Sequence, residues 1–252
     1  AAKLSSICRL TASGKAETPV QGAGQEVRAL TGTVERLRAG AVVVQHWSGR
    51  EISTGAHKTP VTAPVRVGVL GLDGDAQGNT KVHGGPDKAL CCYPVENYGA
   101  WAAEGREIGE DGFFENLTLR GLTEAQVHLG DVFLLGSARV QVTQPRRPCT
   151  TVSARWGDRG LPARMQETGR CGFYLRVLEP GVLAEGDAMT LAERLPESVS
   201  VAEANRVMNV DRLDRAGIGR LLASPELPER WRRDLEQRLT GRLGDDSARL
   251  GG

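Results

Sequence analysis

The stretch Asp131-Val-Phe-Leu-Leu-Gly-Ser-Ala-Arg-Val-Gln-Val-Thr-Gln144 holds two short, strand-like runs on either side of Gly136-Ser137. Each run has the length and composition of a β-strand, and glycine next to serine is typical of a turn. The stretch therefore predicts strands over Asp131–Leu135 and Arg139–Gln144.

Similar runs recur along the chain on both sides of this stretch. They predict further strands over Ala41–Gln45, Val65–Leu70, Ala89–Tyr93, Cys171–Leu178 and Ala188–Leu191. In this part of the chain, helices are expected only over Val95–Glu104 and Pro162–Thr168. Short strands with so few crossover helices favour a mainly antiparallel β-barrel or sandwich over a doubly wound sheet.

The N-terminal part predicts less regular structure. Lys3–Leu10 has the pattern of a strand, and Thr11–Gly40 is expected to be an insertion or a mobile segment with at most one short helix. We assign residues 1–48 to the barrel domain as this strand plus the insertion, and residues 49–194 to the remainder of the barrel.

After Leu195 the pattern becomes helical. Ser200-Val-Ala-Glu203 is a capping box, in which serine and glutamate satisfy each other's helix-start amides, and it predicts a helix through Met208. A second helix is expected over Asp211–Ala223, and a third begins at Pro228. The residues expected to face inward are Leu213, Ile218, Leu221, Leu222, Trp231, Leu235, Leu239 and Leu243. Residues 195–252 therefore predict a small three-helix module, without visible chemistry of its own.

The composition excludes several classes of protein. In 252 residues, 32 Lys and Arg balance 31 Asp and Glu for a net charge of +1, which argues against a broad nucleic-acid surface. No apolar run approaches the roughly 18 residues of a membrane helix, and no signal peptide is recognised. The five cysteines are irregularly spaced, which fits neither a disulfide framework nor a zinc site. We expect a cytoplasmic protein with free thiols and no membrane or nucleic-acid partner.

The segment Gln144-Pro-Arg-Arg-Pro-Cys149 is the first candidate for chemistry. Its two prolines keep the chain extended, so that Arg146 and Arg147 precede the thiol of Cys149 on a stiff loop. Nearby cations stabilise a thiolate, which is both a nucleophile and a soft metal ligand. Guanidinium groups also bind phosphate through paired donors. The alternative is a surface loop with a half-buried, inert cysteine.

The segment His83-Gly-Gly-Pro-Asp-Lys88 is the second candidate. Consecutive glycines let backbone amides approach a ligand, and Lys88 offers a point charge to an anion. It lacks the glycine spacing and the Ser/Thr of a Walker loop. The alternative is an ordinary tight turn, with His83 as a structural hydrogen-bonding residue.

Three further groups are open to two interpretations. Glu115-Asn116 is either a reader of a heterocycle's donors and acceptors or a polar pair that caps a turn. Arg170 offers another anion contact, whereas the neighbouring Cys171 is expected to be a small buried side chain. Cys91 and Cys92 point to opposite faces of a strand, so separate free thiols are favoured over a vicinal disulfide. Asp73-Gly-Asp75 imitates the start of a calcium loop, but Gly84 stands where the bidentate glutamate should be.

Taken in order, these segments resemble the MOSC family (molybdenum cofactor sulfurase C-terminal domain), in its YiiM-type branch. The C-terminal module also resembles the one that this branch carries. The matching pieces are Ser53-Thr-Gly55, Lys58-x-Pro60, Gly71-Leu-Asp-Gly-Asp75, His83-Gly-Gly-Pro-Asp-Lys88-Ala, Tyr93-Pro94, Glu115-Asn-Leu117, Gly121-Leu-Thr, Gly130-Asp131, Gln144-Pro-Arg-x-Pro-Cys149, Gly169-Arg-Cys-Gly172 and Gly186-Asp187.

The resemblance implies a distorted antiparallel β-barrel that holds the molybdenum cofactor, a pterin with a phosphate. Cys149 would then be the catalytic thiolate that ligates molybdenum. The residues expected to contact the cofactor are His83, Lys88, Glu115, Asn116, Arg146, Arg147 and Arg170. Two departures stand out: Phe114 replaces a glycine, which would narrow the pocket, and Cys91-Cys92 replace histidines, which puts any proton delivery there in doubt.

The activity that the resemblance implies is reduction of N-hydroxylated compounds, such as N-hydroxylated purines and hydroxylamines, by oxygen transfer to molybdenum. Because the chain shows no flavin, haem or iron–sulfur motif, a separate electron-donor protein of the flavoprotein or iron–sulfur type is expected. The alternative is a carrier of the cofactor, or of sulfur as a persulfide on Cys149. A thiol-only redox protein that uses Cys91-Cys92 is a third option.

Overall fold

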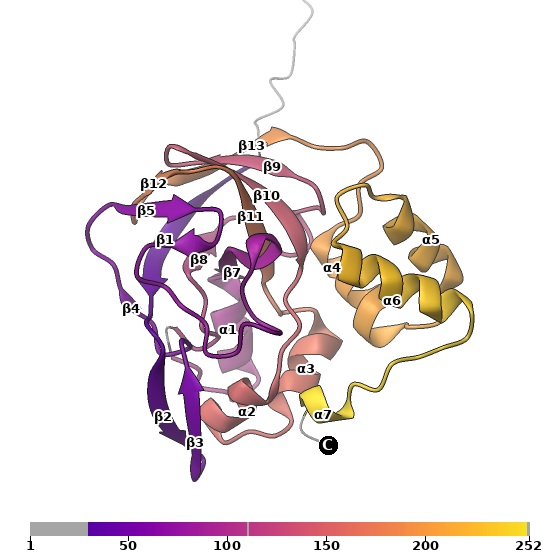
Figure 1. The fold of residues 1–252 in the computed structure, drawn as a ribbon, viewed down its shortest axis with the longest axis horizontal. Coiled ribbons are helices and arrows are strands. Elements are labelled where there is room, and N and C mark those ends of the chain that lie inside the picture. Colours follow the sequence, from indigo (N-terminus) through magenta and orange to yellow (C-terminus); the bar gives the residue numbers. More distant parts are fainter. Residues whose placement is uncertain (1–29, 110, 251–252) are drawn as a thin grey trace, which may run out of the picture.

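The computed structural model describes residues 30–109 and 111–250 (Figure 1). The predicted strand Lys3–Leu10 and most of the predicted insertion lie outside these ranges. No helix within them is long and apolar enough to cross a bilayer.

Seven strands close into a barrel, in the order β1-β13-β9-β10-β11-β7-β8 and back to β1. All neighbours pair antiparallel except β7 and β8, which are parallel. The distorted, mainly antiparallel barrel predicted from the sequence is therefore confirmed. Its strands are β1 (Thr31–Ala39), β7 (Leu90–Pro94), β8 (Leu117–Arg120), β9 (Val132–Leu135), β10 (Ala138–Pro145), β11 (Phe173–Glu179) and β13 (Ala188–Glu193).

The predicted pair of strands on either side of Gly136-Ser137 is the hairpin β9–β10. Leu135 and Ala138 are partners across its turn, and Gly136 has the positive φ of 54° that such a turn favours. Strand β10 has two register shifts against β11, so it bends as it leaves the barrel. Its end at Pro145 delivers the chain directly into the loop that carries Cys149.

Strand β1 contradicts the expectation of an irregular segment up to Gly40. It pairs with β8 and β13, and so it closes the barrel. Its buried apolar residues Val34 and Leu37 are three positions apart, because a bulge lies between Val34 and Arg36. The bulge removes the two-residue alternation by which a strand is recognised.

Smaller sheets lie outside the barrel. The predicted strand over Ala41–Gln45 belongs to the hairpin β2–β3, and the one over Val65–Leu70 to a three-stranded sheet. Strands β3, β4, β6, β8 and β12 were not predicted. The outer strands are β2 (Val43–Trp47), β3 (Arg50–Thr54), β4 (Thr59–Pro60), β5 (Val65–Gly68), β6 (Gly71–Leu72) and β12 (Gly181–Leu183).

Helices cover one end of the barrel. The predictions for α1 (Glu96–Ala103) and α3 (Leu161–Thr168) are correct to within one residue. Helix α2 (Thr150–Trp156) was not predicted, and it begins directly after Cys149. A short 3-10 turn, Pro86–Lys88, leads into β7.

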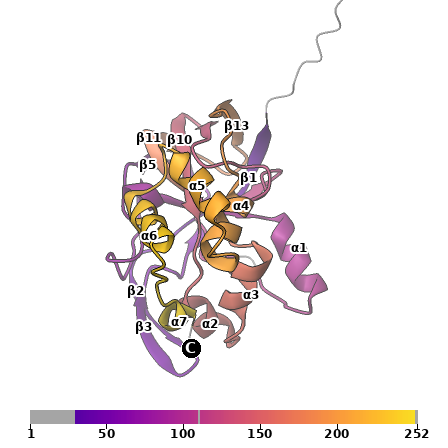
Figure 2. The same ribbon diagram turned by 90° about the vertical axis from the view of Figure 1, so that its right-hand side faces the viewer.

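The C-terminal module lies against one side of the barrel (Figures 1 and 2) and shares its hydrophobic core. Its elements are α4 (Val201–Asn205), a π-helical turn (Arg206–Val210), α5 (Arg215–Ala223), α6 (Glu229–Leu239) and α7 (Ser247–Leu250). The Ser200 hydroxyl caps α4 by accepting from the Glu203 amide, whereas the Glu203 carboxylate pairs with Arg206 and Arg220. Leu213 and Leu243 are exposed, contrary to prediction, because they lie beyond the ends of α5 and α6.

Candidate functional site

The loop from β10 to α2 brings a thiol and a guanidinium together. The Arg146 amide donates to the Gly172 carbonyl at 2.9 Å, which fixes the start of the loop on the chain entering β11. Cys149 has extended backbone and stands immediately before the first turn of α2. The side chain of Arg146 is buried and that of Cys149 is half-buried.

Cys149 is an acidic thiol. Burial is the largest influence and raises its pKa, but hydrogen bonds from the His83 and Thr151 side chains and the charge of Arg146 outweigh it, and the pKa falls to about 6. The residue is therefore mostly thiolate at neutral pH, in the form that binds soft metals and attacks electrophiles.

Arg146 is a buried cation with an unused donor. Its exposed fraction is 5%, and its Nη1 atom has no hydrogen-bond partner within the described part of the chain. Burial acts to lower its pKa, but the neighbouring acidic groups Cys91, Tyr174 and Cys149 hold the pKa above its ordinary value. A buried donor left unpaired beside a thiolate suits an anionic ligand.

The glycine loop before β7 supplies His83 to this site. Gly84 and Gly85 have φ of 72° and 86°, which reverse the chain. Lys88 lies on the same loop, where its Nζ donates to the Val82 carbonyl at 2.8 Å and stands 5.7 Å from the ring centroid of Tyr174. Burial and the charges of two arginines lower the Lys88 pKa, so it belongs to a cationic region.

Glu115 and Asn116 are both buried but differ in role. Glu115 is fully buried and accepts from the Tyr98 hydroxyl at 2.6 Å and the Thr118 hydroxyl at 3.0 Å. The Asn116 amide accepts from the Cys91 backbone at 3.0 Å and donates to the Arg38 carbonyl at 3.2 Å. Asn116 therefore joins β7 to β1.

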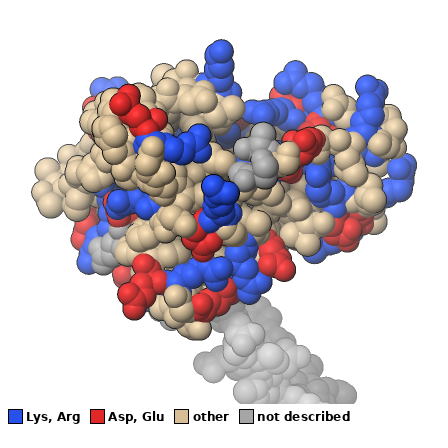
Figure 3. Space-filling model, turned by 90° about the horizontal axis from the view of Figure 1, so that it is seen from below, with Lys and Arg blue, Asp and Glu red and all other residues tan. Residues whose placement is uncertain are grey.

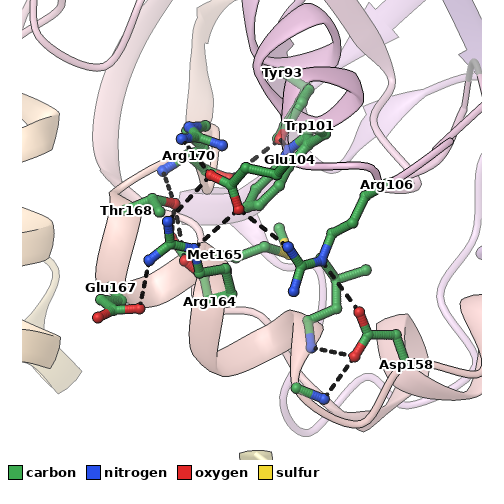
Figure 4. A network of polar contacts seen from close by, with 12 residues as sticks. Tyr93, Trp101, Glu104, Arg106, Asp158, Arg164, Met165, Glu167, Thr168 and Arg170 are labelled. Atoms are coloured by element: carbon green, nitrogen blue, oxygen red, sulfur yellow. Dashed lines mark hydrogen bonds and ion pairs between the residues drawn. The ribbon is translucent and has the colours of Figure 1, made fainter.

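Two of the predicted anion-binding arginines are engaged in other clusters. Arg147 donates twice to Asp246, and Arg170 donates to Glu104 and stacks 4.6 Å from the ring centroid of Trp101 (Figure 4). The structure thus gathers His83 and Arg146 around Cys149. It does not place the guanidinium groups of Arg147 and Arg170 with them.

Several neighbours of the site were not identified from the sequence. Thr151 binds the thiol, and Tyr174 lies opposite Cys91 in the β11–β7 pairing and contacts Arg146. Lys58 and Asp75 form a buried ion pair. Both belong to the pieces on which the family resemblance rests, but nothing in the sequence indicated that they form a pair.

The other cysteines differ from Cys149. All four that the structure describes are free, and Cys91, Cys92 and Cys171 are buried. Burial raises the pKa of Cys91 to about 11, so this thiol stays protonated. Cys171 donates to the Met165 carbonyl at 3.1 Å, as expected of a small buried side chain.

The donor set limits how a metal could be held. Across residues 30–109 and 111–250 there is no cluster of three His, Cys, Asp or Glu side chains suited to a metal ion. Cys149 can contribute one thiolate, and further ligands would have to come from a bound cofactor. Seen from below, acidic and basic side chains are intermingled on the surface, without an extended patch of one sign on that face (Figure 3).

Family models match two parts of the chain. The MOSC domain matches residues 79–190, and the YiiM-like, 3-alpha helix domain matches residues 199–242. The first covers the site loops and most of the barrel, and the second covers α4 to α6.

Relatives extend the match over most of the chain. The chain is 39% identical to the uncharacterized protein YflK of Bacillus subtilis, covering 79% of this chain and 91% of that protein. It is 38% identical to YiiM of Escherichia coli, over 77% and 89%. A protein named reductase from Gibberella moniliformis is 31% identical over 77% of this chain but only 33% of its own length.

Solved structures agree with this result. The crystal structure of YiiM from Geobacillus stearothermophilus has a TM-score of 0.70 and 34% identity, covering 82% of this chain and 99% of that one. The crystal structure of YiiM from Escherichia coli has a TM-score of 0.67 and 33% identity, over 86% and 100%. The chain therefore belongs to the MOSC family, among the YiiM-like proteins whose barrel is followed by a three-helix domain.

Proposed function

We propose that this protein binds the molybdenum cofactor through Cys149 and reduces N-hydroxylated compounds to amines. MOSC domains are generally associated with this cofactor, and one relative is named a reductase. The observation that carries the proposal is the juxtaposition of an acidic thiol with a buried, partly unpaired guanidinium.

These residues fit the cofactor's chemistry. A thiolate is a soft ligand of the kind that the metal would need from the protein. Arg146 would neutralise an anionic group next to that ligand, and it already has a donor without a partner. Lys88, in its cationic region, is the further candidate for the cofactor's phosphate.

The bound cofactor would supply the two-electron redox chemistry. The overall change, R–NHOH + 2e⁻ + 2H⁺ → R–NH₂ + H₂O, consumes two protons and needs electrons from outside the chain. His83 is the candidate for passing a proton, because an imidazole has ring nitrogens that can donate and accept and this one already contacts the thiol. We assign the electrons to a separate flavoprotein or iron–sulfur protein, and the reaction to the cytoplasm.

The experiment is expression with a full supply of the cofactor, followed by molybdenum quantitation and turnover of an N-hydroxylated purine with a reduced dye as donor. We expect Cys149→Ser to lower both the bound molybdenum and the turnover at least a hundredfold. Cys171→Ser is the matched control, because this thiol is buried and donates to the Met165 carbonyl. Full activity of Cys149→Ser would contradict the proposal.

A carrier gives a different result. It would bind molybdenum, or a persulfide on Cys149, and pass it to an apo-acceptor without reducing the purine. That outcome would replace the reductase with the alternative that the sequence left open.

A further inference from the structure

The C-terminal segment reaches from the helical module back to the cysteine loop. After α6 the chain runs along the molecule, and α7 lies beside α2 in both views (Figures 1 and 2). Arg212 holds the start of this segment by donating to the Gly244 carbonyl at 2.6 Å.

The C-terminal segment forms hydrogen bonds with Arg147 and Pro148, the two residues that precede Cys149. Asp246 accepts from Arg147 Nη2 with both carboxylate oxygens, at 2.7 and 2.9 Å. Arg249 donates from Nη1 to the Pro148 carbonyl at 2.7 Å and from Nη2 to Gln166 of α3, also at 2.7 Å. The side chain of one residue of the loop and the backbone of the next are thus both held.

The Asp246 carboxylate also lies close to three arginine side chains. Besides Arg147, it lies 3.1 Å from Arg249 and 3.9 Å from Arg212. Burial acts to raise its pKa, but these three cations lower it. Without the carboxylate, Arg147 would face Arg249, and its buried Nε atom already has no partner among the residues that the structure describes.

We propose that Asp246 and Arg249 are positioning residues for Cys149. By holding the side chain of Arg147 and the carbonyl of Pro148, they keep the thiol in contact with His83, Thr151 and Arg146. The C-terminal segment is then part of the site, although the sequence analysis found no chemistry in the module. The proposal concerns the thiol itself, so it does not depend on the cofactor or on the reductase activity.

The test is the pH dependence of iodoacetamide alkylation at Cys149 in the purified full chain, followed by peptide mass spectrometry from pH 5 to 9. We expect Asp246→Asn to raise the apparent pKa by about one unit, which lowers the rate at pH 6.5 severalfold. The direction of the shift in the thiol pKa distinguishes two effects of the substitution. Loss of a negative charge alone would lower the thiol pKa, whereas displacement from His83, Thr151 and Arg146 would raise it.

Asp245→Asn is the matched control, because this neighbouring carboxylate accepts from Ser247 and does not contact the loop. It should leave the alkylation profile unchanged. Arg249→Lys is the milder second variant in case Asp246→Asn folds poorly. It keeps the charge but loses the fork that reaches Pro148 and Gln166 together, so we expect a smaller shift in the same direction.

Hydrogen exchange gives a readout independent of the thiol. The Val152 amide, which donates to the Cys149 carbonyl at 3.0 Å, should exchange faster in both segment variants than in Asp245→Asn. Folded variants with the unmodified alkylation profile and unmodified exchange would overturn the proposal. So would a fall in the thiol pKa of Asp246→Asn.

Discussion

Two groups of arginines in this molecule differ in whether carboxylates balance their charge. Around Glu104, one carboxylate accepts from Arg106 at 3.0 Å, Arg164 at 3.0 Å and Arg170 at 2.7 Å (Figure 4). Asp158 and Glu167 add further carboxylates to this cluster. In contrast, Arg146 has no carboxylate within ion-pair distance among the residues the structure describes.

This difference in carboxylate partners distinguishes a cluster that stabilises the fold from a candidate ligand-binding site. In the Glu104 cluster, cations and carboxylates pair with one another and join α1 to α3, as in many surface networks of modest energy. At Arg146, a buried cation is left with a thiolate, a tyrosine and an aromatic ring as its neighbours. Among the residues the structure describes, Nη1 of Arg146 has no hydrogen-bond partner, so this cation can also bind an anionic ligand.

The largest effect on stability is expected at the buried ion pair Lys58–Asp75, which tests how much charge pairing contributes to the free energy of unfolding. The side chains of Lys58 and Asp75 are 6% and 2% exposed, so Lys58→Met leaves a carboxylate buried without its cation. We expect a loss of about 3–5 kcal/mol in the free energy of unfolding, measured by urea denaturation. The alkylation profile of Cys149 should change little.

Glu185→Gln is the control for Lys58→Met. It breaks a pair with Arg36 whose side chains are 40% and 43% exposed, and it should cost less than about 1 kcal/mol. If both variants cost the same, burial of a pair does not determine its contribution here.

The next prediction concerns Phe114, whose aromatic ring lies beside the Arg146 guanidinium. Its ring lies 5.8 Å from the Arg146 guanidinium and stacks on Trp47, while its backbone has a strained φ of 62°. Phe114→Gly would remove buried apolar contacts worth about 3–5 kcal/mol and relieve about 1–2 kcal/mol of strain. We expect a net loss of about 2–3 kcal/mol by urea denaturation.

Comparison of Phe114→Ala with Phe114→Gly isolates the backbone strain, since both variants lack the ring but alanine keeps a Cβ at positive φ. The alanine variant should be less stable than Phe114→Gly by about 1 kcal/mol. Equal stabilities would mean that the backbone at this position is not strained.

Much of the fold could be predicted from the sequence. The failure to predict strand β1 has a physical cause. Strand β9 is a continuous apolar run, and β10 alternates apolar and polar residues from Ala138 to Thr143, so both have a recognisable strand pattern. Strand β1 alternates exposed and buried residues only as far as its bulge, and its polar residues hide the rest of the pattern. Hydrophobic spacing therefore found the strands of the hairpin but missed the strand that closes the barrel.

The site could be predicted only as a set of candidates. The sequence analysis expected both Arg146 and Arg147 at the site, but successive residues of an extended chain point to opposite sides. Arg147 instead donates to Asp246, which is 99 positions away along the chain. Likewise, Arg170 is directed away by Glu104, 66 positions earlier. Such distant partners have no local signal in the sequence.

Arg146→Met tests the unpaired cluster directly. Loss of the cation should raise the pKa of Cys149 from about 6 by about one unit and lower its alkylation rate at pH 6.5 severalfold. The free energy of unfolding should fall at neutral pH, because the fold favours the charged guanidinium and the buried thiolate would lose its cation. His83→Ala should raise the thiol pKa further, since the His83 hydrogen bond lowers it more than the Arg146 charge does.

Arg170→Met is the control for Arg146→Met, because it removes a guanidinium from the paired cluster. It should leave the alkylation profile of Cys149 unchanged. If it changes that profile as much as Arg146→Met does, the two clusters are not separate.

The smallest effect is expected at Glu104, in the acid range. Hydrogen bonds from Arg164 and then Arg170 lower its pKa from 4.5 to about 2, and these outweigh the effect of burial. A carboxylate whose pKa falls on folding stabilises the protein fully above its unfolded pKa and loses that contribution as the pH falls through its folded pKa. The contribution of Glu104 is therefore present above about pH 4.5 and lost towards pH 2.

Glu104→Gln should accordingly lower the Tm slightly at pH 6, and the difference from the unmodified protein should vanish between pH 4.5 and 2. Salt should reduce it, because the cluster is partly exposed. Glu107→Gln, at an exposed carboxylate of the same segment, is the control and should give no such pH dependence. The variant should also alkylate at Cys149 with the unmodified profile, because a paired cluster that only joins α1 to α3 has no means of tuning the thiol. A shifted profile would mean that the charge balance of the Glu104 cluster acts on the site as well.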